Sequence, residues 1–345
     1  MDIQSQIDYL FEAARCTPSA DNSQPWRLRW NGKTLAAGYD ALRVKNVTFA
    51  PENPATLLAM GALLENLQQA AAAAEIRLES VDHPADQYFQ LNVSSDFPLP
   101  AGCMNHPLFL RHTNRLPFRA DPLPAVLSDW LASQGEGAAR VTVLGGSSEI
   151  SRVARLVGQA SAIRFQTREI TEWLGRSLRF TPNEVASGDG LDVGTLHLPP
   201  GGKGLLRLIA DWRRMESFNR WGAYRLLAAI EAKAVTNASA ILTIVSIAGR
   251  RGARDAGQLM ERVWIELNRQ GLSVQPFYVV ADQLFRREEG VLPKGLEHRG
   301  DLLADEAESV FGLSDRKLYM LLRVGFPKRI PVKSRRLPLP LICES

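Results

Sequence analysis

The length and composition of the chain are those of a globular protein. Its 345 residues are 45% hydrophobic and 23% charged, which is enough to bury a substantial core in one large domain or two of ordinary size. The most apolar stretch, residues 238–248, has the length of a strand and contains serine and threonine, whereas a membrane helix needs roughly 20 apolar residues. We therefore expect a soluble chain without a membrane partner.

The cysteines and the first residues indicate a cellular compartment. Cys16, Cys103 and Cys343 are odd in number and widely spaced, which suits a reducing cytosol better than a disulfide framework. The opening residues are acidic and polar and lack the basic and apolar regions of a signal peptide. We expect a cytoplasmic protein, and we expect no bound metal because no metal-ligand spacing is present.

The net charge of +4 does not by itself predict nucleic-acid binding, since most basic residues are interspersed with acidic ones along helical segments. We expect no nucleic-acid partner. The exception to this interspersion is a basic run near the C-terminus, which consists of Lys328, Arg329, Lys333, Arg335 and Arg336. That run is either a solvated tail or an edge that binds phosphate.

The first part of the chain combines helices and strands. Apolar spacing and turn residues predict, in chain order, helix 3–14, strand 26–30, helix 55–74, strand 76–81 and strand 88–93. Thr17-Pro18 ends the first helix, and a polar loop separates it from the first strand. A proline-rich bridge at 97–107 closes this part.

The second part begins near residue 111 and is richer in helix. The predicted elements are helix 125–133, strand 139–144, a long helical stretch after 147, a helix through 212–232, strand 240–247, helix 255–270, and strands around 274–280 and 318–325. Residues 181–203, rich in Gly, Pro and Asp, predict an excursion or lid, because long irregular segments inside compact domains are often functional.

An internal repeat links two helices that contain a glycine followed by a glutamate. Gly61 and Glu65 align with Gly257 and Glu261 at an offset of 196 positions, and the register continues into the strand that follows each helix. A chance match between two amphipathic helices is the alternative interpretation.

Residues 18–26 are the most informative segment of the sequence. They read Pro-Ser-Ala-Asp-Asn-Ser-Gln-Pro-Trp. Ser, Asn and Gln side chains offer hydrogen-bond donors and acceptors to a planar heterocycle, and prolines restrict the backbone that aims them. The segment therefore predicts a binding loop. The alternative is a helix-to-strand connection in which Asn and Asp satisfy turn geometry.

A second candidate segment carries two cations and a hydroxyl in alternation. On an extended backbone the side chains of Arg111, Thr113 and Arg115 point to one side. Such a group suits a single anion, for example a phosphate. A salt-bridged surface turn is the alternative.

These segments together resemble the nitroreductase-like FMN flavoprotein family. Loop 18–26 is similar to the family signature P-S-x-x-N-x-Q-P-W, which borders the flavin ring. Residues 111–115 resemble its R-x-S-x-R element, whose first Arg and hydroxyl hold the FMN phosphate and whose last cation lies near the N1 and O2 edge of the ring. Residues 331–338 resemble the K-S-R-x-P element that completes the phosphate pocket.

A fourth segment, residues 271–278, looks like the strand and proline turn whose backbone amide faces flavin N5 in that family. This match is looser, because Tyr278 and Val279 stand where family members often carry Glu and Gly. The resemblance implies an α+β nitroreductase-like fold with FMN as cofactor and no catalytic acid or base, since the flavin supplies the redox chemistry. The implied cofactor-binding residues are Pro18, Ser19, Asn22, Gln24, Arg111, His112, Thr113, Arg115, Pro276, Phe277, Tyr278, Lys333 and Arg335.

The order of these segments implies a fused pseudo-dimer. In ordinary family members the R-x-S-x-R element precedes the loop, and each flavin takes its phosphate contacts from one subunit and its loop from the other. Here the loop lies in a first half, residues 1–105, and the other elements lie in a second half, residues 106–345. Residues 132–138 lack the Asn, Pro and Trp of a second loop. We therefore expect one complete site per chain and a monomer that binds FMN, with further oligomerisation open.

The resemblance implies an activity as well. It is the two-electron reduction of a small-molecule acceptor, such as a nitroaromatic or a quinone, with NAD(P)H as the transient electron donor. Two alternatives stay open: a flavin-sequestering protein with little turnover, and an FMN-dependent dehydrogenase of a specific metabolite.

Overall fold

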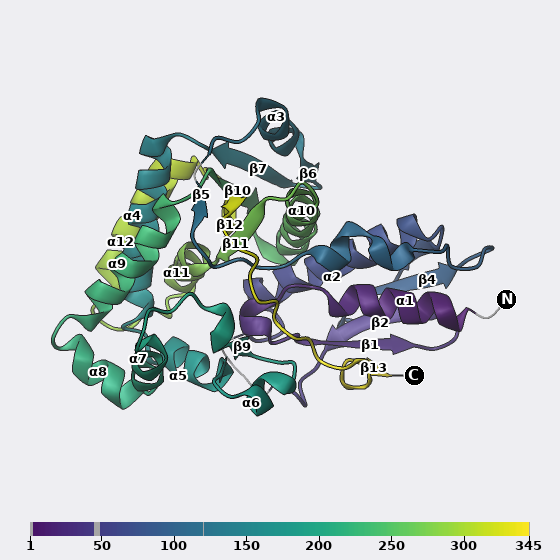
Figure 1. Cartoon of the computed structure of the whole chain (residues 1–345), viewed down its shortest axis with the longest axis horizontal. Helices are drawn as coiled ribbons and strands as arrows, with labels where there is room; N and C mark the ends of the chain where they lie inside the picture. Colours follow the sequence, from purple (N-terminus) through teal and green to yellow (C-terminus); the bar gives the residue numbers. More distant parts are fainter. Residues whose placement is uncertain (1–2, 45–48, 120, 345) are drawn as a thin grey trace.

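The computed structural model describes residues 3–44, 49–119 and 121–344, so the outer ends of the two expected halves, residues 1 and 345, lie outside the described residues. The fold is α+β, as expected: helices pack on two separate β-sheets (Figure 1). One sheet lies with α1 and α2 on the right of Figure 1, and the other is covered by the helices on the left.

The first sheet has five strands in the order β13-β1-β2-β4-β3. Its antiparallel strands are β1 (Trp26–Trp30), β2 (Thr34–Tyr39), β3 (Arg77–Val81) and β4 (Gln87–Ser94). The helices beside it are α1 (Gln4–Arg15) and α2 (Pro54–Ala73). Asn53 caps α2 by accepting a hydrogen bond from the Ala55 amide, and Pro54 at the first helical position suits the start of a helix.

The second sheet has the order β11-β12-β10-β7-β6 and is antiparallel throughout. Its strands are β6 (Gly135–Glu136), β7 (Ala139–Leu144), β10 (Ala240–Ser246), β11 (Ser273–Phe277) and β12 (Lys317–Pro327), and β5 (Phe118–Arg119) pairs with the end of β12. Every residue of β10 is buried, as expected for its apolar run at the centre of the sheet. The helices of this part are α3 (Ala125–Ser133), α4 (Ser147–Arg164), α5 (Arg168–Ser177), α9 (Ala223–Thr236), α10 (Gly249–Arg269), α11 (Val279–Glu288) and α12 (Glu297–Phe311).

The expected excursion at 181–203 contains short elements. They are α6 (Pro182–Ala186) and β9 (Leu191–Asp192), and they are followed by α7 (Gly202–Ile209) and α8 (Trp212–Asn219). β9 pairs in parallel with β8 (Leu178–Arg179), so this pair of strands anchors the excursion.

Three predicted elements were wrong in their extent. The helix expected over 212–232 divides into α8 and α9 at Gly222, whose φ of 84° is left-handed. Helix α10 begins at Gly249 rather than 255, because two glycines and three arginines hide the apolar spacing of its first turns. The strand expected around 274–280 ends at Phe277, and Val279 already belongs to α11.

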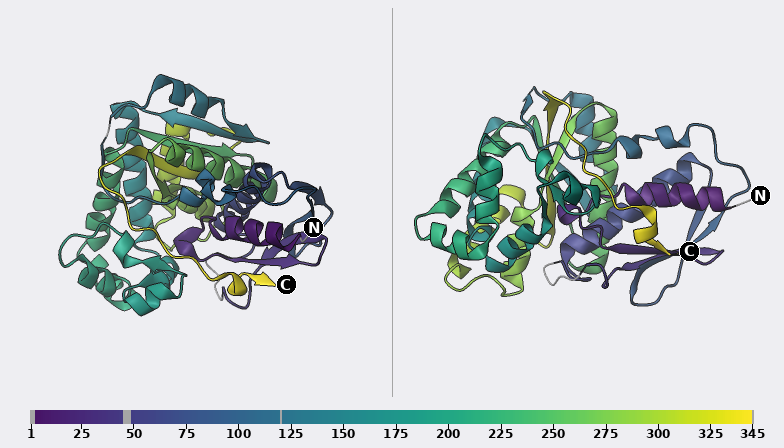
Figure 2. Two further views of the ribbon diagram at one scale, coloured as in Figure 1. Left: turned by 45° about the vertical axis from the view of Figure 1, so that its right-hand side comes forward. Right: turned by 60° about the horizontal axis from the view of Figure 1, so that its bottom comes forward.

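The C-terminal segment connects the two sheets. It leaves the second sheet after β12 and ends as β13 (Cys343–Glu344), which pairs in parallel with β1 (the yellow segment in Figures 1 and 2). Leu337 and Ile342 are buried along this path, and the Leu28 amide donates to the Ile342 carbonyl at 2.7 Å. Membership of the two sheets therefore does not follow the sequence order of the two expected halves.

Helices α2 and α10 cross in close contact at the two glycines of the sequence repeat. A Cβ atom on Gly61 would lie 2.1 Å from the carbonyl oxygen of Arg254, and one on Gly257 would lie 2.1 Å from that of Leu58. Leu58 and Arg254 are themselves related by the offset of 196. Each helix thus presents the same position to the other, which is the contact pattern of a two-fold symmetric interface.

The first testable prediction concerns this crossing. We expect Gly61→Ala to lower the free energy of unfolding by about 1–3 kcal/mol, because the new methyl group meets backbone atoms that cannot rotate away. Gly204→Ala is the matched control: it lies in α7 with no atom within 4 Å of the added Cβ, and alanine there favours the helix. Urea unfolding measures both variants. Equal stability of the two would show that the helices do not pack this closely.

Candidate functional site

Loop 18–25 has an unusual backbone. Asp21, Asn22 and Gln24 have φ values of 47°, 58° and 48°, so three non-glycine residues within four positions are left-handed. Such residues persist only where surrounding contacts hold them, and they cluster at binding and active sites. One of those contacts is local, because the Gln24 amide donates to Ser19 Oγ at 2.9 Å.

Two buried side-chain amides hold this loop against distant parts of the chain. Asn22 Nδ2 lies 3.1 Å from the Gly190 carbonyl and 3.0 Å from the Arg335 carbonyl. Gln24 Nε2 donates to the Gly188 carbonyl at 3.0 Å, and Gln24 Oε1 accepts from the Leu337 amide at 3.1 Å. The loop, the excursion and the C-terminal segment therefore meet at one place.

Gly188 is required at this meeting point. Its φ of 81° is left-handed, and a Cβ atom there would lie 2.3 Å from the carbonyl oxygen of Arg336. The excursion reaches the C-terminal segment because this position lacks a side chain.

The segment with Arg111 lies beside the loop. Arg111 Nε is 2.8 Å from Glu261 Oε1, and the two side chains are 2% and 0% exposed. The Arg111 guanidinium also donates to the Cys16 carbonyl and stacks 4.7 Å from the Trp264 ring centroid. Arg111 Nε and both Glu261 oxygens are not aligned with any hydrogen-bond partner among the described residues. The pair is held by this close ion pair, so another acceptor reaches the Arg111 Nε only by displacing the Glu261 carboxylate.

A second arginine, Arg336, adds to this buried charge. Its guanidinium donates to Asn22 Oδ1 and lies 3.4 Å from the Cys16 carbonyl. Burial, and then the nearby Arg111, lower the pKa of Arg336 to about 9, so it stays cationic at neutral pH. Burial raises the pKa of Glu261 to about 7, against the opposing effect of Arg111. The buried Arg111 and the half-buried Arg336 thus face one carboxyl group whose ionisation is disfavoured by burial. The excess positive charge suits an anionic ligand.

Arg115 reaches the other side of the loop. Its Nη1 donates to Thr195 Oγ1 of the excursion at 3.3 Å. Burial lowers the pKa of Arg115 and Asp21 raises it, while Asp21 itself accepts from Trp173 Nε1 at 2.9 Å. Burial raises the pKa of Asp21, and that hydrogen bond opposes the rise. Arg111 contacts Cys16 and Arg115 lies near Asp21, so the two arginines flank residues 16–22, whereas their alternation along an extended segment predicts that they point to one side.

The backbone between these arginines extends the second sheet. Thr113 forms an isolated parallel bridge with Val274, and the Asn114 amide donates to the Val274 carbonyl at 2.9 Å. The His112 amide donates to Asn268 Oδ1 at 2.9 Å, and burial lowers the pKa of the His112 imidazole. The strand that contains Pro276 and Phe277 thus lies next to this segment.

The remaining expected residues take other positions. The side chains of Lys333 and Arg335 are exposed, although Arg335 contributes its carbonyl to Asn22. Burial raises the pKa of the Tyr278 phenol well above its usual range, with Asp282 adding to the rise. None of the described hydrogen bonds or ion pairs joins Tyr278 to the loop. The structure therefore brings together Ser19, Asn22, Gln24, Arg111 and Arg115, with the half-buried Arg336 rather than the exposed Arg335 as the cation that joins them.

The repeat relates this site to a second position around Glu65, where negative charge rather than positive charge is in excess. Glu65 corresponds to Glu261, and it accepts from Arg262 at 2.8 Å. Arg262 also lies 2.8 Å from Glu136, and both carboxylates raise its pKa. Asn66, which corresponds to Arg262, lies beside Glu261 and lowers the pKa of that carboxyl. Because two carboxylates surround one guanidinium there, the second position has no excess positive charge with which to bind an anion.

Sequence reasoning missed several of these residues. Arg336 stood in the basic run, but the choice between it and Arg335 depends on the path of an irregular segment. Glu261 was noticed for the repeat and not as the partner of Arg111. Trp173 and Thr195 carried no signal, because α5 and the excursion reach the loop from far along the chain.

Over residues 3–44, 49–119 and 121–344, no three His, Cys, Asp or Glu side chains are grouped so as to hold a metal ion. Across the same ranges, no helix is both long enough and apolar enough to cross a membrane.

Comparison with known proteins gives a sequence relative but no family model. No protein-family model matches the chain. An uncharacterized protein, MT1398 of Mycobacterium tuberculosis, is 29% identical over 290 residues, which cover 79% of this chain and 39% of that protein. The match therefore spans well under half the length of that relative.

Several solved structures share parts of the arrangement. The FMN-dependent nitroreductase NfnB from Mycobacterium smegmatis, solved in complex with NADPH, matches with a TM-score of 0.39 and 16% identity, over 69% of this chain and 95% of that one. A nitroreductase with bound FMN from Bacteroides fragilis matches with a TM-score of 0.37 and 8% identity, over 68% and 94%. A BluB-like flavoprotein from Clostridium difficile matches with a TM-score of 0.38 and 9% identity, over 70% and 98%.

The second testable prediction concerns the pH dependence of stability. The folded pKa of Glu261, about 7, lies above its ordinary value of 4.5. The contribution of Glu261 to stability is therefore fully present below about pH 4.5 and is lost as the pH rises to about 7, because the carboxyl ionises at a lower pH in the unfolded chain than in the folded one. We expect the loss, relative to Glu261→Gln, to be on the order of 3 kcal/mol across this range. Chemical unfolding at several pH values measures it.

The exposed Glu79→Gln variant is the control, and it should keep the wild-type dependence on pH. If Glu261→Gln also kept that dependence, Glu261 would have an ordinary pKa and the excess positive charge at the site would be smaller than we infer.

Proposed function

We propose that this chain is a nitroreductase-like flavoprotein that binds FMN and uses it for NAD(P)H-dependent reduction of a small-molecule acceptor. The observation that carries the proposal is the pair of cations, the buried Arg111 and the half-buried Arg336, beside the left-handed loop at Asn22. This pair coincides with the segments that resemble the phosphate and ring elements of that family.

The charge of the cluster fits a phosphate. The buried Arg111 and the half-buried Arg336 provide two guanidinium groups, and the Arg111 Nε faces Glu261 at 2.8 Å. Glu261 is the competing anion, and because burial raises the pKa of its carboxyl, that carboxyl is protonated more easily than an exposed one. A phosphate held here accepts charge-assisted hydrogen bonds, and Thr113 lies two residues from Arg111 to add a hydroxyl.

The loop suits the ring of the same ligand. Ser19, Asn22 and Gln24 supply polar side chains, and Arg115 brings a buried positive charge to the other side of the loop. When bound, FMN supplies the transfer of two electrons between NAD(P)H and the acceptor. The residues of this chain bind and orient it, and they exclude water through the excursion.

We also propose that the chain is a fused pseudo-dimer with halves 1–105 and 106–345. The reciprocal contacts of Gly61 and Gly257 support an internal two-fold axis. The two positions related by that axis differ in charge, because Arg262 neutralises Glu65 and Glu136 at one of them. One FMN per chain follows from this difference.

A second candidate function is flavin sequestration with little turnover. The excursion touches the loop directly, since the Gly188 and Gly190 carbonyls accept from Asn22 and the Thr195 hydroxyl accepts from Arg115. An excursion in this position would cover a flavin bound at the loop. Turnover requires that it move to admit NAD(P)H and the acceptor.

The third prediction tests the phosphate contact. We expect Arg336→Gln to weaken FMN binding by roughly ten- to a hundredfold, the value of one charge-assisted hydrogen bond, and to leave riboflavin binding nearly unchanged. Riboflavin lacks the phosphate, so the ratio of the two affinities isolates this contact from the ring contacts. Fluorescence titration of the flavin measures both.

The exposed Arg213→Gln variant removes the same charge elsewhere and should keep the wild-type ratio. A chain that binds neither flavin, or binds riboflavin as tightly as FMN, would overturn the proposed site.

The fourth prediction concerns stoichiometry and turnover. Light scattering combined with flavin absorbance should give one FMN per chain of 38.1 kDa, with a monomer able to retain it. Two flavins per chain would contradict the fused arrangement. Consumption of NADH or NADPH with a nitroaromatic or quinone acceptor then separates the two candidate functions, because a sequestering protein retains FMN without steady turnover.

A further inference from the structure

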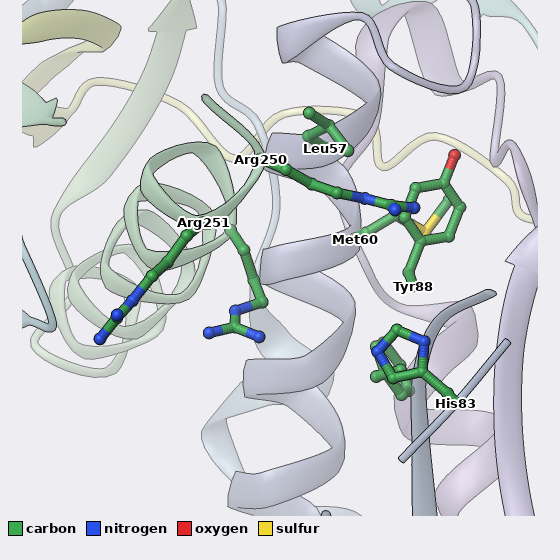
Figure 3. A pocket seen from close by; sticks show the side chains of 8 residues that line it. Leu57, Met60, His83, Tyr88, Arg250 and Arg251 are labelled. Carbon is green, nitrogen blue, oxygen red and sulfur yellow. The ribbon is translucent and has the colours of Figure 1, made fainter. Parts of the chain in front are cut away.

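A cavity of about 280 Å³ lies between the first turns of α2 and α10 and strand β4 (Figure 3). Its apolar side comes from Leu57, Met60, Tyr88 and Phe89, and its basic side from the start of α10 together with His83. None of these residues belongs to the candidate flavin site, whose contributions from α10, Glu261 and Trp264, lie further along the helix. The cavity is therefore a separate feature of the fold.

The arginines around this cavity are weakly paired. Arg250 lies 3.6 Å from Glu52, and Arg254 lies 3.6 Å from Asp255, a carboxylate that also accepts from the Ala138 amide. Charge-assisted hydrogen bonds are shorter, about 2.7–2.9 Å, as between Arg262 and Glu65. Among the described contacts, Arg250 makes one hydrogen bond, to the Gln87 carbonyl at 3.4 Å, and Arg254 makes none. These guanidinium groups keep donors for a ligand.

Helix stability does not explain the three arginines here. Arg250, Arg251 and Arg254 stand in the first two turns of a 21-residue helix that has no acidic residue in its first turn. Cations in the first turn of a helix oppose the helix dipole. A bound anion would offset both this repulsion and the mutual repulsion of the arginines.

The apolar side of the cavity suits a flat ring. Figure 3 shows Arg250 extending from α10 over the Tyr88 ring, with its guanidinium carbon 5.2 Å from the ring centroid. Tyr88 and Phe89 are buried, so the aromatic rings that line the cavity are held in place by packing. A second cavity of about 290 Å³ shares Tyr88 and Arg250, so there is room for a substituent beyond the ring.

We propose that this cavity binds a planar aromatic anion, with the ring against Tyr88 and Met60 and the carboxylate or phosphate held by Arg250 and Arg254. The site is independent of the flavin site, so it provides a place for a second small molecule on the same chain.

The purified full chain, loaded with FMN, is titrated with three probes in a calorimeter: 2-naphthoate, 2-naphthyl phosphate and neutral 2-naphthamide. We expect the two anions to bind at least about tenfold more tightly than the amide, since the charge-assisted contacts supply the difference. The anion that binds more tightly distinguishes a carboxylate ligand from a phosphate ligand. An amide that binds as tightly as both anions would overturn the proposal.

The double variant Arg250→Gln/Arg254→Gln should lose this preference while it keeps its flavin. Arg213→Gln/Arg220→Gln removes the same charge from an exposed part of α8 and the residue after it, and it should bind the anions like wild type. Should the first double variant unfold, Leu57→Trp fills the cavity and should abolish anion binding. Anion binding that survives these changes, or is lost in Arg336→Gln instead, would place it elsewhere.

Discussion

The close crossing of α2 and α10 is the contact on which the rest of the molecule depends. Because Gly61 and Gly257 lack side chains, the two backbones meet at contact distance, and each helix carries the sheet that packs on its own side. Glu65 and Glu261 lie one turn further along the two helices, so the crossing also fixes their positions. The two glutamates face different partners. A wider crossing would move Asn66 of α2, which donates to Thr17 just before the loop, away from Glu261 of α10. The packing of two glycines therefore sets the geometry of the charged site.

The two glutamates show how a symmetric framework acquires an asymmetric function. Glu65 faces Arg262, whose guanidinium it shares with Glu136, so that position is satisfied internally. Glu261 faces Arg111 and Arg336, and its surroundings contain more positive than negative charge. The difference arises partly from a single pair of positions in the repeat, because Arg262 stands where the other helix has Asn66. Arg262 neutralises the acidic residues at one position, whereas the neutral amide of Asn66 leaves the positive charge at the other position for a ligand.

The sequence predicted the local elements well where the signal was periodic. Strand 139–144 and helix 125–133 have the bounds that alternation and apolar spacing indicate, whereas β2 was missed because Thr34 to Tyr39 contains two alanines and a glycine in place of β-branched residues.

For the candidate site, the loop and Arg111 to Arg115 could be predicted from residue type and spacing. The partners of Asn22 could not, since they are backbone carbonyls in irregular segments, and a carbonyl has no signature in sequence. Arg336 rather than Arg335 points inward for the same reason: period-two alternation does not apply to a segment without a ladder of hydrogen bonds.

The loop gathers segments that are far apart in the chain, and this has a consequence for how the site forms. Asn22 bonds to the excursion near 190 and to the C-terminal segment near 335, and Gln24 bonds to both as well. Left-handed backbone at Asp21, Asn22 and Gln24 costs free energy that local contacts alone do not return. The loop conformation is therefore stable only after the excursion and the C-terminal segment have docked, and β13 fastens the latter to β1 beside the loop. A ligand held by Arg336 would strengthen that docking, so binding at the site and ordering of the segments around it are coupled.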